Sequence, residues 1–455
     1  MSDQLISILV LVAVFLIATV LPVHMGALAL VAAFIVGSFV LSGPMDDKID
    51  TILGGFPGDL FVILVGVTYL FALAKENGTV DWLVHKSVRA VGGRVALIPW
   101  VMFAVTAVIT AFGAVVPAAV AIIAPIGMGF AKRYNINPLL MGLMVINGAS
   151  AGGFSPLSIF GSITNGVVEK ADLPGNPTVL FLSSLVFNIV LGLVTFVLFG
   201  GRALLGKIDK GDGDMIDTHD GGSANSGTPS SSQRRATTTS VQTTSIPSAG
   251  LSEPVTTLDR NRALTVIGML ALAVGALGFE LDVGFSAVTL AVILSVFSPG
   301  ANKGAVSAIA WPTVLLICGI VTYVSLMELI GTIDWLGDNV ADIGTPLVAA
   351  ILICFIGAFV SAFASTTGIL GALIPLAVPF LLDGEVGAIG MICALAISSS
   401  VVDSSPFSTS GALVVANAGD EDRDRVYKQL MAWGFSMCLI APIVTWAVFV
   451  VPGWG

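Results

Sequence analysis

Long apolar runs, separated by short polar stretches, repeat along almost the whole chain. A helix of about 20 apolar residues crosses the hydrocarbon core of a bilayer, so we expect ten transmembrane helices. Five are predicted at about 4–22, 24–42, 59–75, 138–165 and 178–200, and five at about 263–281, 284–299, 311–329, 387–417 and 429–451. The pattern therefore predicts an all-α polytopic membrane protein.

The two sets of spans are predicted to be copies of one unit. The sequence Gly-Thr-Val-Asp-Trp-Leu at 78–83 recurs as Gly-Thr-Ile-Asp-Trp-Leu at 331–336. Ser-Pro-Leu-Ser-Ile-Phe-Gly at 155–161 recurs as Ser-Pro-Phe-Ser-Thr-Ser-Gly at 405–411. Similar matches occur in the same order at nearly one offset, which indicates an internal duplication.

One further apolar segment in each half does not read as a simple span. These segments, at about 95–131 and 346–382, each hold an arm of about 17 residues, a short break and an arm of about 13 residues. Thirteen helical residues rise only about 20 Å, less than the hydrocarbon core of about 30 Å. We therefore expect a re-entrant hairpin at each segment.

The basic residues predict the orientation of the two repeats. Five spans is an odd number, so the second repeat is inverted relative to the first. With both termini outside, only Lys48 and Lys170 of the 19 Lys and Arg residues lie outside, as the positive-inside rule requires. The expected organisation is a first repeat at 1–208 with its hairpin open to the cytoplasm, and a second at 263–455 with its hairpin open to the exterior. The Gly-, Ser- and Thr-rich segment 209–262 is predicted to be a disordered cytoplasmic linker.

The fourth long segment of each half is too polar and too rich in helix breakers to be one regular helix. Such a break at membrane depth puts half-helix N-termini, which attract anions, beside carbonyl and hydroxyl oxygens that suit a small cation. The alternative is a packing kink whose hydroxyls bond back to the backbone. The substrate-binding candidates from these segments are Asn147, Ser155, Pro156, Ser405, Pro406 and Thr409.

The two hairpin tips differ in polarity. The second tip, at 361–368, carries Ser365, Thr366 and Thr367, which we predict to bind substrate. The first tip, at 110–117, is apolar. The second half should therefore supply more of the polar ligands.

Asp403 is the one acidic residue predicted at membrane depth. Intramembrane carboxylates commonly bind a cation or carry a proton, but the position also suits an N-cap for a half-helix starting near Pro406. No Lys or Arg is predicted at the midplane. An anionic substrate would then be balanced by helix dipoles, hydroxyls and a co-bound cation, which favours symport.

These motifs resemble the divalent anion:sodium symporters of the ion transporter superfamily, and most closely the malonate-type dicarboxylate carriers, through 55–60 and 403–412. In the symporters the hairpin tips touch the substrate carboxylates and a sodium ion. The resemblance implies a cation site around Ser365, Ser405 and Ser408. We place Asp403 with this site because of its predicted depth, as a cation ligand or as the proton carrier. A second cation site, around Ser150, Ser155 and Ser158, stays open because the first tip departs from the pattern. The family also implies a homodimer with an elevator mechanism.

We therefore expect a multi-pass transporter of the cell membrane, with no enzymatic activity and no cofactor besides Na⁺ or H⁺ as the coupling ion. Its expected partners are a small dicarboxylate such as malonate or succinate, the lipid bilayer and a second copy of the chain, with no nucleic acid. One alternative is an efflux or exchange protein of the same superfamily, such as an arsenite or proton antiporter. An intramembrane hydrolase is the other, but no His is predicted at membrane depth to assist a serine.

Overall fold

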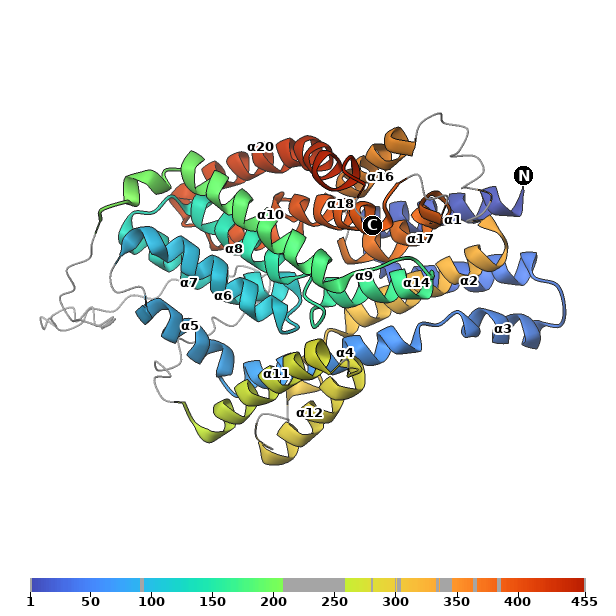
Figure 1. Ribbon diagram of the computed structural model, residues 1–455, viewed down its shortest axis with the longest axis horizontal. Helices are drawn as coiled ribbons and strands as arrows, with labels where there is room; N and C mark the ends of the chain where they lie inside the picture. The colour runs from blue at the N-terminus through green and yellow to red at the C-terminus, as the bar shows by residue number, and fades with distance from the viewer. Residues whose placement is uncertain are drawn as a thin grey trace, which may run out of the picture.

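The protein is described by a computed structural model, which places residues 2–90, 94–207, 258–279, 281–298, 300, 304–332, 335, 346–362, 366–382 and 386–453. These described residues form helices joined by short connections, with no strand among them (Figure 1). The prediction of an all-α fold is confirmed. Most of the expected linker 209–262, namely residues 209–257, lies outside the described residues.

The first half contains ten α-helices and two short 3₁₀ turns within the described residues. They are α1 (Asp3–Val20), α2 (Met25–Val40), α3 (Met45–Gly54), α4 (Gly58–Glu76), α5 (Thr79–Ala90), η1 (Val95–Leu97), α6 (Ile98–Ala111), α7 (Val116–Tyr134), α8 (Pro138–Gly152), α9 (Ile159–Lys170), α10 (Pro177–Leu198) and η2 (Gly201–Leu204).

The second half repeats much of this order. Its described elements are α11 (Arg260–Gly278), α12 (Val283–Phe297), α14 (Trp311–Leu329), α16 (Pro346–Ser361), α17 (Thr366–Leu382), α18 (Ala388–Val401), η3 (Val402–Ser404), α19 (Thr409–Asn417), α20 (Asp420–Thr445) and η4 (Trp446–Val450). The last of these is a single π-helical turn that extends α20.

Helices lie at all ten predicted spans. Within the described residues, six helical segments are long and apolar enough to cross a membrane, by length and composition: 58–76, 116–134, 177–198, 311–329, 388–417 and 420–450. Several others, such as α2 and α12, are apolar but shorter. Two helices were not predicted, α3 and α5, because each carries several charged residues and has little net hydrophobicity.

The expected hairpins are helix pairs, but one premise of that prediction is wrong. The first pair is α6 and α7, and the second is α16 and α17. The arm α7 has 19 residues rather than about 13, because it begins directly after the tip and continues past the apolar segment through Lys132 and Arg133. A helix of that length rises about 28 Å, so shortness does not argue that this pair is re-entrant. Re-entry stays a prediction.

Seven helices, α1, α2, α3, α4, α11, α12 and α14, form what we call the scaffold, in which the two halves cross each other. Helix α2 packs on α14 and α4 packs on α12 (Figure 1). Glycines permit both crossings: a Cβ on Gly26 would lie 2.1 Å from the carbonyl oxygen of Leu315, and one on Gly66 would lie 2.7 Å from that of Gly284. Small residues at such crossings let helix backbones touch.

The remaining long helices, α6–α10 and α16–α20, form what we call the core. Within each half, the first hairpin arm packs on the first arm of the broken helix: α6 on α8, and α16 on α18. Between halves, α9 packs on α17 and α19 packs on α7. Each half therefore places part of its broken helix against the hairpin of the other half, which brings both breaks into the middle of the core.

Candidate functional site

Both predicted helix breaks are present. In the first half α8 ends at Gly152 and α9 begins at Ile159. In the second half α18 ends at Val401, the turn η3 follows, and α19 begins at Thr409. Six residues separate the two α-helices at the first break, and seven separate them at the second. Both breaks lie within segments that are predicted to span the membrane.

The two breaks share one backbone design. Ser158 is the N-cap of α9 and accepts a hydrogen bond from the Gly161 N–H at 3.3 Å, while Ser408 caps α19 and accepts from the Gly411 N–H at 3.0 Å. Each hydroxyl also donates into the carbonyls of its own break. For these two serines, the alternative of a hydroxyl bonded back to the backbone is what the structure shows.

Glycine is required one turn after each cap. A Cβ on Gly161 would lie 2.0 Å from the carbonyl oxygen of Ser155, and a Cβ on Gly411 would lie 1.9 Å from that of Ser405. A contact that short forces the backbone to shift. The Ser-Pro-x-Ser-x-x-Gly pattern is therefore the sequence of a folded turn at both breaks.

The side chain of Asp403 is what joins the second break to the second hairpin. Thr366, the first residue of α17, donates a hydrogen bond to Asp403 Oδ1 at 2.6 Å. Ser361, the last residue of α16, lies 2.8 Å from the Thr366 hydroxyl and donates to the Ser399 carbonyl at 2.8 Å. All of these side chains are buried, with exposed fractions of 8% for Asp403, 4% for Thr366 and 0% for Ser361.

The three contacts of this chain can all be hydrogen bonds only when Asp403 carries a proton. A hydroxyl carries one hydrogen, so Ser361 and Thr366 supply two hydrogens for three contacts. With Asp403 ionised, the contact between the two hydroxyls has no hydrogen to share. With a proton on Asp403, the carboxyl donates to Thr366, Thr366 to Ser361, and Ser361 to the Ser399 carbonyl, so every contact is satisfied.

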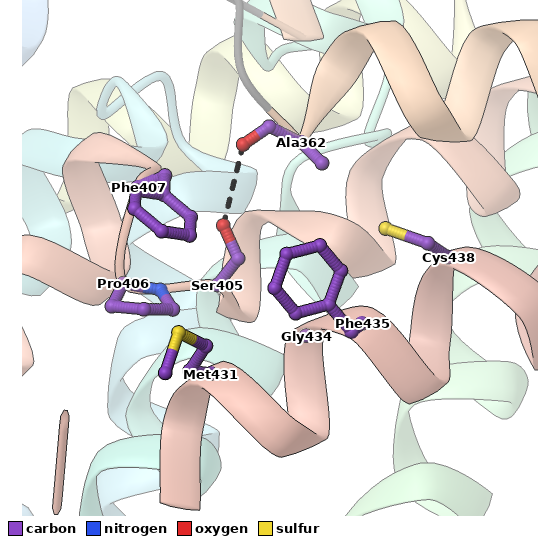
Figure 2. Close-up of a pocket in the computed structure, with 8 residues that line it drawn as sticks. All are labelled: Ala362, Ser405, Pro406, Phe407, Met431, Gly434, Phe435 and Cys438. Carbon is purple, nitrogen blue, oxygen red and sulfur yellow. Dashed lines mark hydrogen bonds between the residues drawn. The ribbon is translucent and has the colours of Figure 1, made fainter. Parts of the chain in front are cut away.

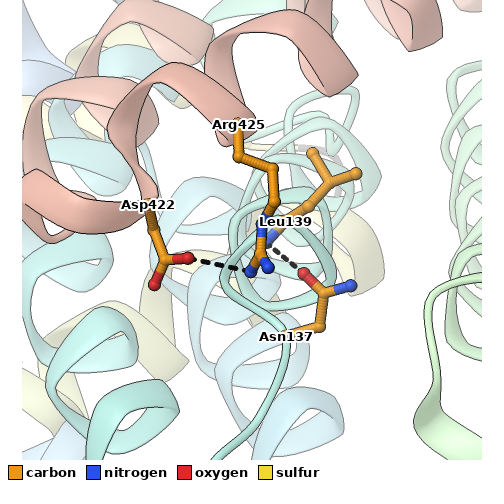
Figure 3. Close-up of polar contacts among 4 residues, drawn as sticks. All are labelled: Asn137, Leu139, Asp422 and Arg425. Atoms are coloured by element: carbon orange, nitrogen blue, oxygen red, sulfur yellow. Dashed lines mark hydrogen bonds and ion pairs between the residues drawn. The ribbon is translucent and has the colours of Figure 1, made fainter.

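The structure decides against an N-cap role for Asp403. The capping side chain of α19 belongs to Ser408, and the helix begins at Thr409 rather than near Pro406. No Lys, Arg or His in the described residues forms an ion pair with Asp403. The two ion pairs at the start of α20 are exposed, and Figure 3 shows one of them, Arg425 with Asp422 at 2.9 Å. A buried carboxyl without a cationic partner is costly unless it is neutralised.

Ser405 makes a second connection between the same break and the second hairpin. Its hydroxyl donates to the Ala362 carbonyl at 3.3 Å, across a small cavity whose wall Figure 2 shows. Helix α20 passes close to this point, since a Cβ on Gly434 would lie 2.6 Å from the Ser405 Cβ. The cavity is lined by Ala362, Ser405, Pro406, Phe407, Met431, Gly434, Phe435 and Cys438.

The first break lacks such a connection. The tip beside it presents Ala114 and Val116, which are buried and apolar. The Ser155 hydroxyl accepts from the backbone N–H of Leu157 at 3.3 Å, within its own turn. Two polar groups on α8, the Asn147 amide nitrogen and the Ser150 hydroxyl, are buried without a hydrogen-bond partner among the described residues.

The other predicted site residues are distributed as follows. Ser365 lies outside the described residues. Thr367 is buried beside Thr366, and Pro406 is buried beside Ser405, whereas Thr409 is exposed. Ser361 was not predicted as a site residue; a polar residue at the end of an otherwise apolar arm was the available signal.

No group of three or more His, Cys, Asp or Glu side chains in the described residues could hold a metal ion. A coupling cation at this break would therefore meet hydroxyl and carbonyl oxygens and the single carboxyl of Asp403. Such hard oxygen ligands suit a small cation rather than a transition metal.

Comparison with known proteins gives two family matches and one fold match. Residues 1–153 match the family described as the N-terminus of the dicarboxylate carrier protein MatC, and residues 279–453 match a citrate transporter family. Curated proteins give no match. The structure resembles the crystal structure of the Alcanivorax borkumensis YdaH transporter, described as having an unusual topology, with a TM-score of 0.57 and 12% identity over 93% of this chain and 96% of that one.

These matches confirm the resemblance to carriers of the ion transporter superfamily. The chain is a transporter and not an enzyme. At 12% identity the YdaH likeness shows the fold alone.

Proposed function

We propose that the protein is a secondary active transporter that couples the uptake of a small dicarboxylate to a cation. The observation that carries the proposal is the buried chain from the second hairpin to the second break, Ser361–Thr366–Asp403. It connects the two elements between which the substrate is proposed to bind. A carboxyl without a cationic partner beside an anion site needs a cation whenever the anion is bound.

Two features support a carboxylate substrate. The half-helices α9 and α19 begin at the breaks, and free N–H groups at helix N-termini attract anions. The families matched by the two halves are described by dicarboxylate and citrate transport. In this proposal Thr366, Thr367 and Ser405 contact the substrate from the second half, and Asn147 and Ser155 contact it from the first.

The hydrogen count favours the proton as the coupling ion. A proton on Asp403 satisfies every contact in the Ser361–Thr366–Asp403 chain, whereas the ionised form leaves one contact without a hydrogen. Sodium, as implied by the resemblance, would need to replace these hydrogen bonds with oxygen ligands around Ser405 and Ser408. Proton coupling and sodium coupling therefore predict different contacts for the same residues.

We further propose that the core moves against the scaffold as an elevator, in a homodimer, with both termini outside and the linker in the cytoplasm. The division into a helix-crossed scaffold and a core that contains both breaks supports this mechanism. In alternating access, one unit rocks or slides past the other around a fixed site.

Substrate exchange in proteoliposomes tests the substrate class without assuming a coupling ion. Vesicles containing purified protein are loaded with unlabelled malonate, succinate or citrate, and entry of the labelled acid is measured. We expect exchange of at least one of these acids, and a loss of at least about tenfold in Thr366→Val, which can neither donate a hydrogen bond to Asp403 nor accept one from it.

Thr110→Val is the matched control, because the Thr110 hydroxyl donates within its own helix to the Thr106 carbonyl at 3.0 Å. Equal exchange by wild type and Thr366→Val would contradict the site. Exchange of none of the acids would contradict the substrate class. Acid that leaves but never enters vesicles would favour an efflux protein.

A further inference from the structure

Lys170 joins the core to the scaffold. It is the last residue of α9, and its ammonium group donates hydrogen bonds to the Ser325 hydroxyl at 2.8 Å and to the Gly55 carbonyl at 3.2 Å. Ser325 lies in the scaffold helix α14, and Gly55 lies between α3 and α4. One side chain therefore contacts two scaffold segments that are far apart in the sequence.

The receiving side of this contact is tightly built. A Cβ on Gly55 would lie 2.8 Å from the Ser325 Cβ, so the carbonyl and the hydroxyl are held side by side. The carboxylates of Asp59 and Glu328 act on the same ammonium group: burial lowers the pKa of Lys170, and both carboxylates raise it. The scaffold thus presents two oxygens, in a negative environment, to one cation from the core.

The repeat-related position has no such contact. By the offset of the repeated Ser-Pro motif this position is Asp420, which pairs with Arg423 within α20 at 2.9 Å. The corresponding half-helix α19 ends at Asn417, whose side-chain amide donates to the Leu413 carbonyl inside the same helix. In the described residues, no side-chain hydrogen bond joins this end of α19 to the scaffold. The contact of Lys170 with the scaffold therefore occurs in one repeat and not in the other. Such a contact favours one of two arrangements of the core against the scaffold.

We propose that Lys170 is a positioning residue that holds the core at one end of its movement, and that breaking its contacts with Ser325 and Gly55 is part of each transport cycle. The inference rests on the moving core of the proposed function. Because hydrogen bonds to a charged group at a partly exposed position are of moderate strength, their loss should change the ratio of the two arrangements about fivefold.

A distance measurement between core and scaffold tests this directly, without substrate. Cysteines are introduced at two exposed positions, Asp50 in α3 and Thr178 in α10, neither of which takes part in the hydrogen bonds of Lys170. The four native cysteines are buried, so nitroxide labels should attach to the introduced ones. Electron paramagnetic resonance then gives the distribution of distances between the two labels in detergent and in nanodiscs.

Lys170→Met should increase a second distance population about fivefold relative to wild type, whereas Lys170→Arg should keep most of the wild-type distribution. Lys48→Met is the control, since the Lys48 ammonium donates to the Ser38 carbonyl at 2.7 Å and so joins α3 to α2 rather than to the core. Melting temperatures of all variants in detergent exclude simple unfolding.

Identical distributions for Lys170→Met and Lys48→Met in folded protein would overturn the inference, whatever the transport assays show. A shifted distribution in a protein that exchanges no dicarboxylate would support the positioning role and contradict only the substrate class. Lys170→Met leaves the proposed substrate and cation site unchanged. In vesicles we therefore expect this variant to change the KM for the transported acid but to keep the cation dependence of wild type.

Discussion

The two broken helices have the same backbone but different chemistry. At the first break the Ser158 hydroxyl donates to the carbonyl of Gly153, and at the second the Ser408 hydroxyl donates to the carbonyl of Asp403. The two accepting residues occupy the same place in the turn. One is a glycine without a side chain, and the other carries the carboxyl that meets Thr366.

The difference separates the residues that form the turn in both copies from the residues that are proposed to couple transport to a cation. The Ser-Pro-x-Ser-x-x-Gly pattern serves both copies, because both need the cap and the close approach of the glycine. The Asp403 carboxyl and the Thr366 hydroxyl that meets it occur in the second copy, where the first copy has Gly153 and Val116. Duplication therefore provided the architecture twice, and the proposed coupling chemistry is built into one copy of it.

The largest expected effect is that of Asp403→Asn. The amide has nearly the shape of the carboxyl but cannot exchange a proton or neutralise a cation, so gradient-driven uptake should fall by about 100-fold or more. Exchange at equal concentrations should be affected less. Asp50→Asn, at an exposed position of α3, is the control. Coupled uptake that survives in Asp403→Asn would place the coupling elsewhere.

Glycine replacements should damage both breaks alike. Gly161→Ala and Gly411→Ala each put a Cβ about 2 Å from a carbonyl oxygen, and each should destabilise the fold by about 2 kcal/mol. Gly129→Ala in α7 meets no atom within 4 Å and serves as the control. Melting temperatures in detergent measure the effect. A large fall in one variant and none in the other would show that the shared backbone design is wrong.

Thr366→Val should separate chemistry from folding. The valine keeps the shape but removes the donor to Asp403, so uptake should fall about tenfold, equal to about 1.4 kcal/mol, while the melting temperature changes little. The repeat-related tip presents apolar side chains, and Val116→Ala should leave uptake within about threefold of wild type. Equal losses in these two variants would remove the asymmetry between the halves.

The smallest effects concern the caps. Ser158→Ala and Ser408→Ala each remove one N-cap and should each cost about 1 kcal/mol of stability. Beyond this shared cost, Ser408→Ala should also change the dependence of uptake on the coupling ion, because Ser408 lies in the proposed cation site. Matching ion dependence in the two variants would contradict that assignment.

Much of the fold followed from hydropathy and internal repetition. Apolar runs located helices at all ten predicted spans, proline with glycines located the first break, and proline within a hydroxyl-rich run located the second. Helices α3 and α5 were not predicted, because their charged residues interrupt the apolar runs on which the prediction depends. The length of α7 was underestimated because the helix begins directly after the tip, at Val116, and continues beyond the apolar segment through Lys132 and Arg133.

The site was predictable only as a set of candidates. Sequence could pick out Asp403 and Thr366 as polar groups in apolar surroundings, but not that one donates to the other. It also could not show that Ser361 extends the contact to α18, because that contact depends on how α16 packs. The contact of Lys170 with Ser325 joins residues 155 apart in the chain, which no local pattern reveals.

The decisive measurement is the accumulation of labelled malonate, succinate and citrate in proteoliposomes, under an inward sodium gradient and separately under an inward proton gradient. We expect accumulation above equilibrium that is driven by a cation gradient in wild type and lost in Asp403→Asn, with the hydrogen count favouring the proton gradient. Accumulation of no acid under either gradient, or accumulation that Asp403→Asn retains in full, would contradict it.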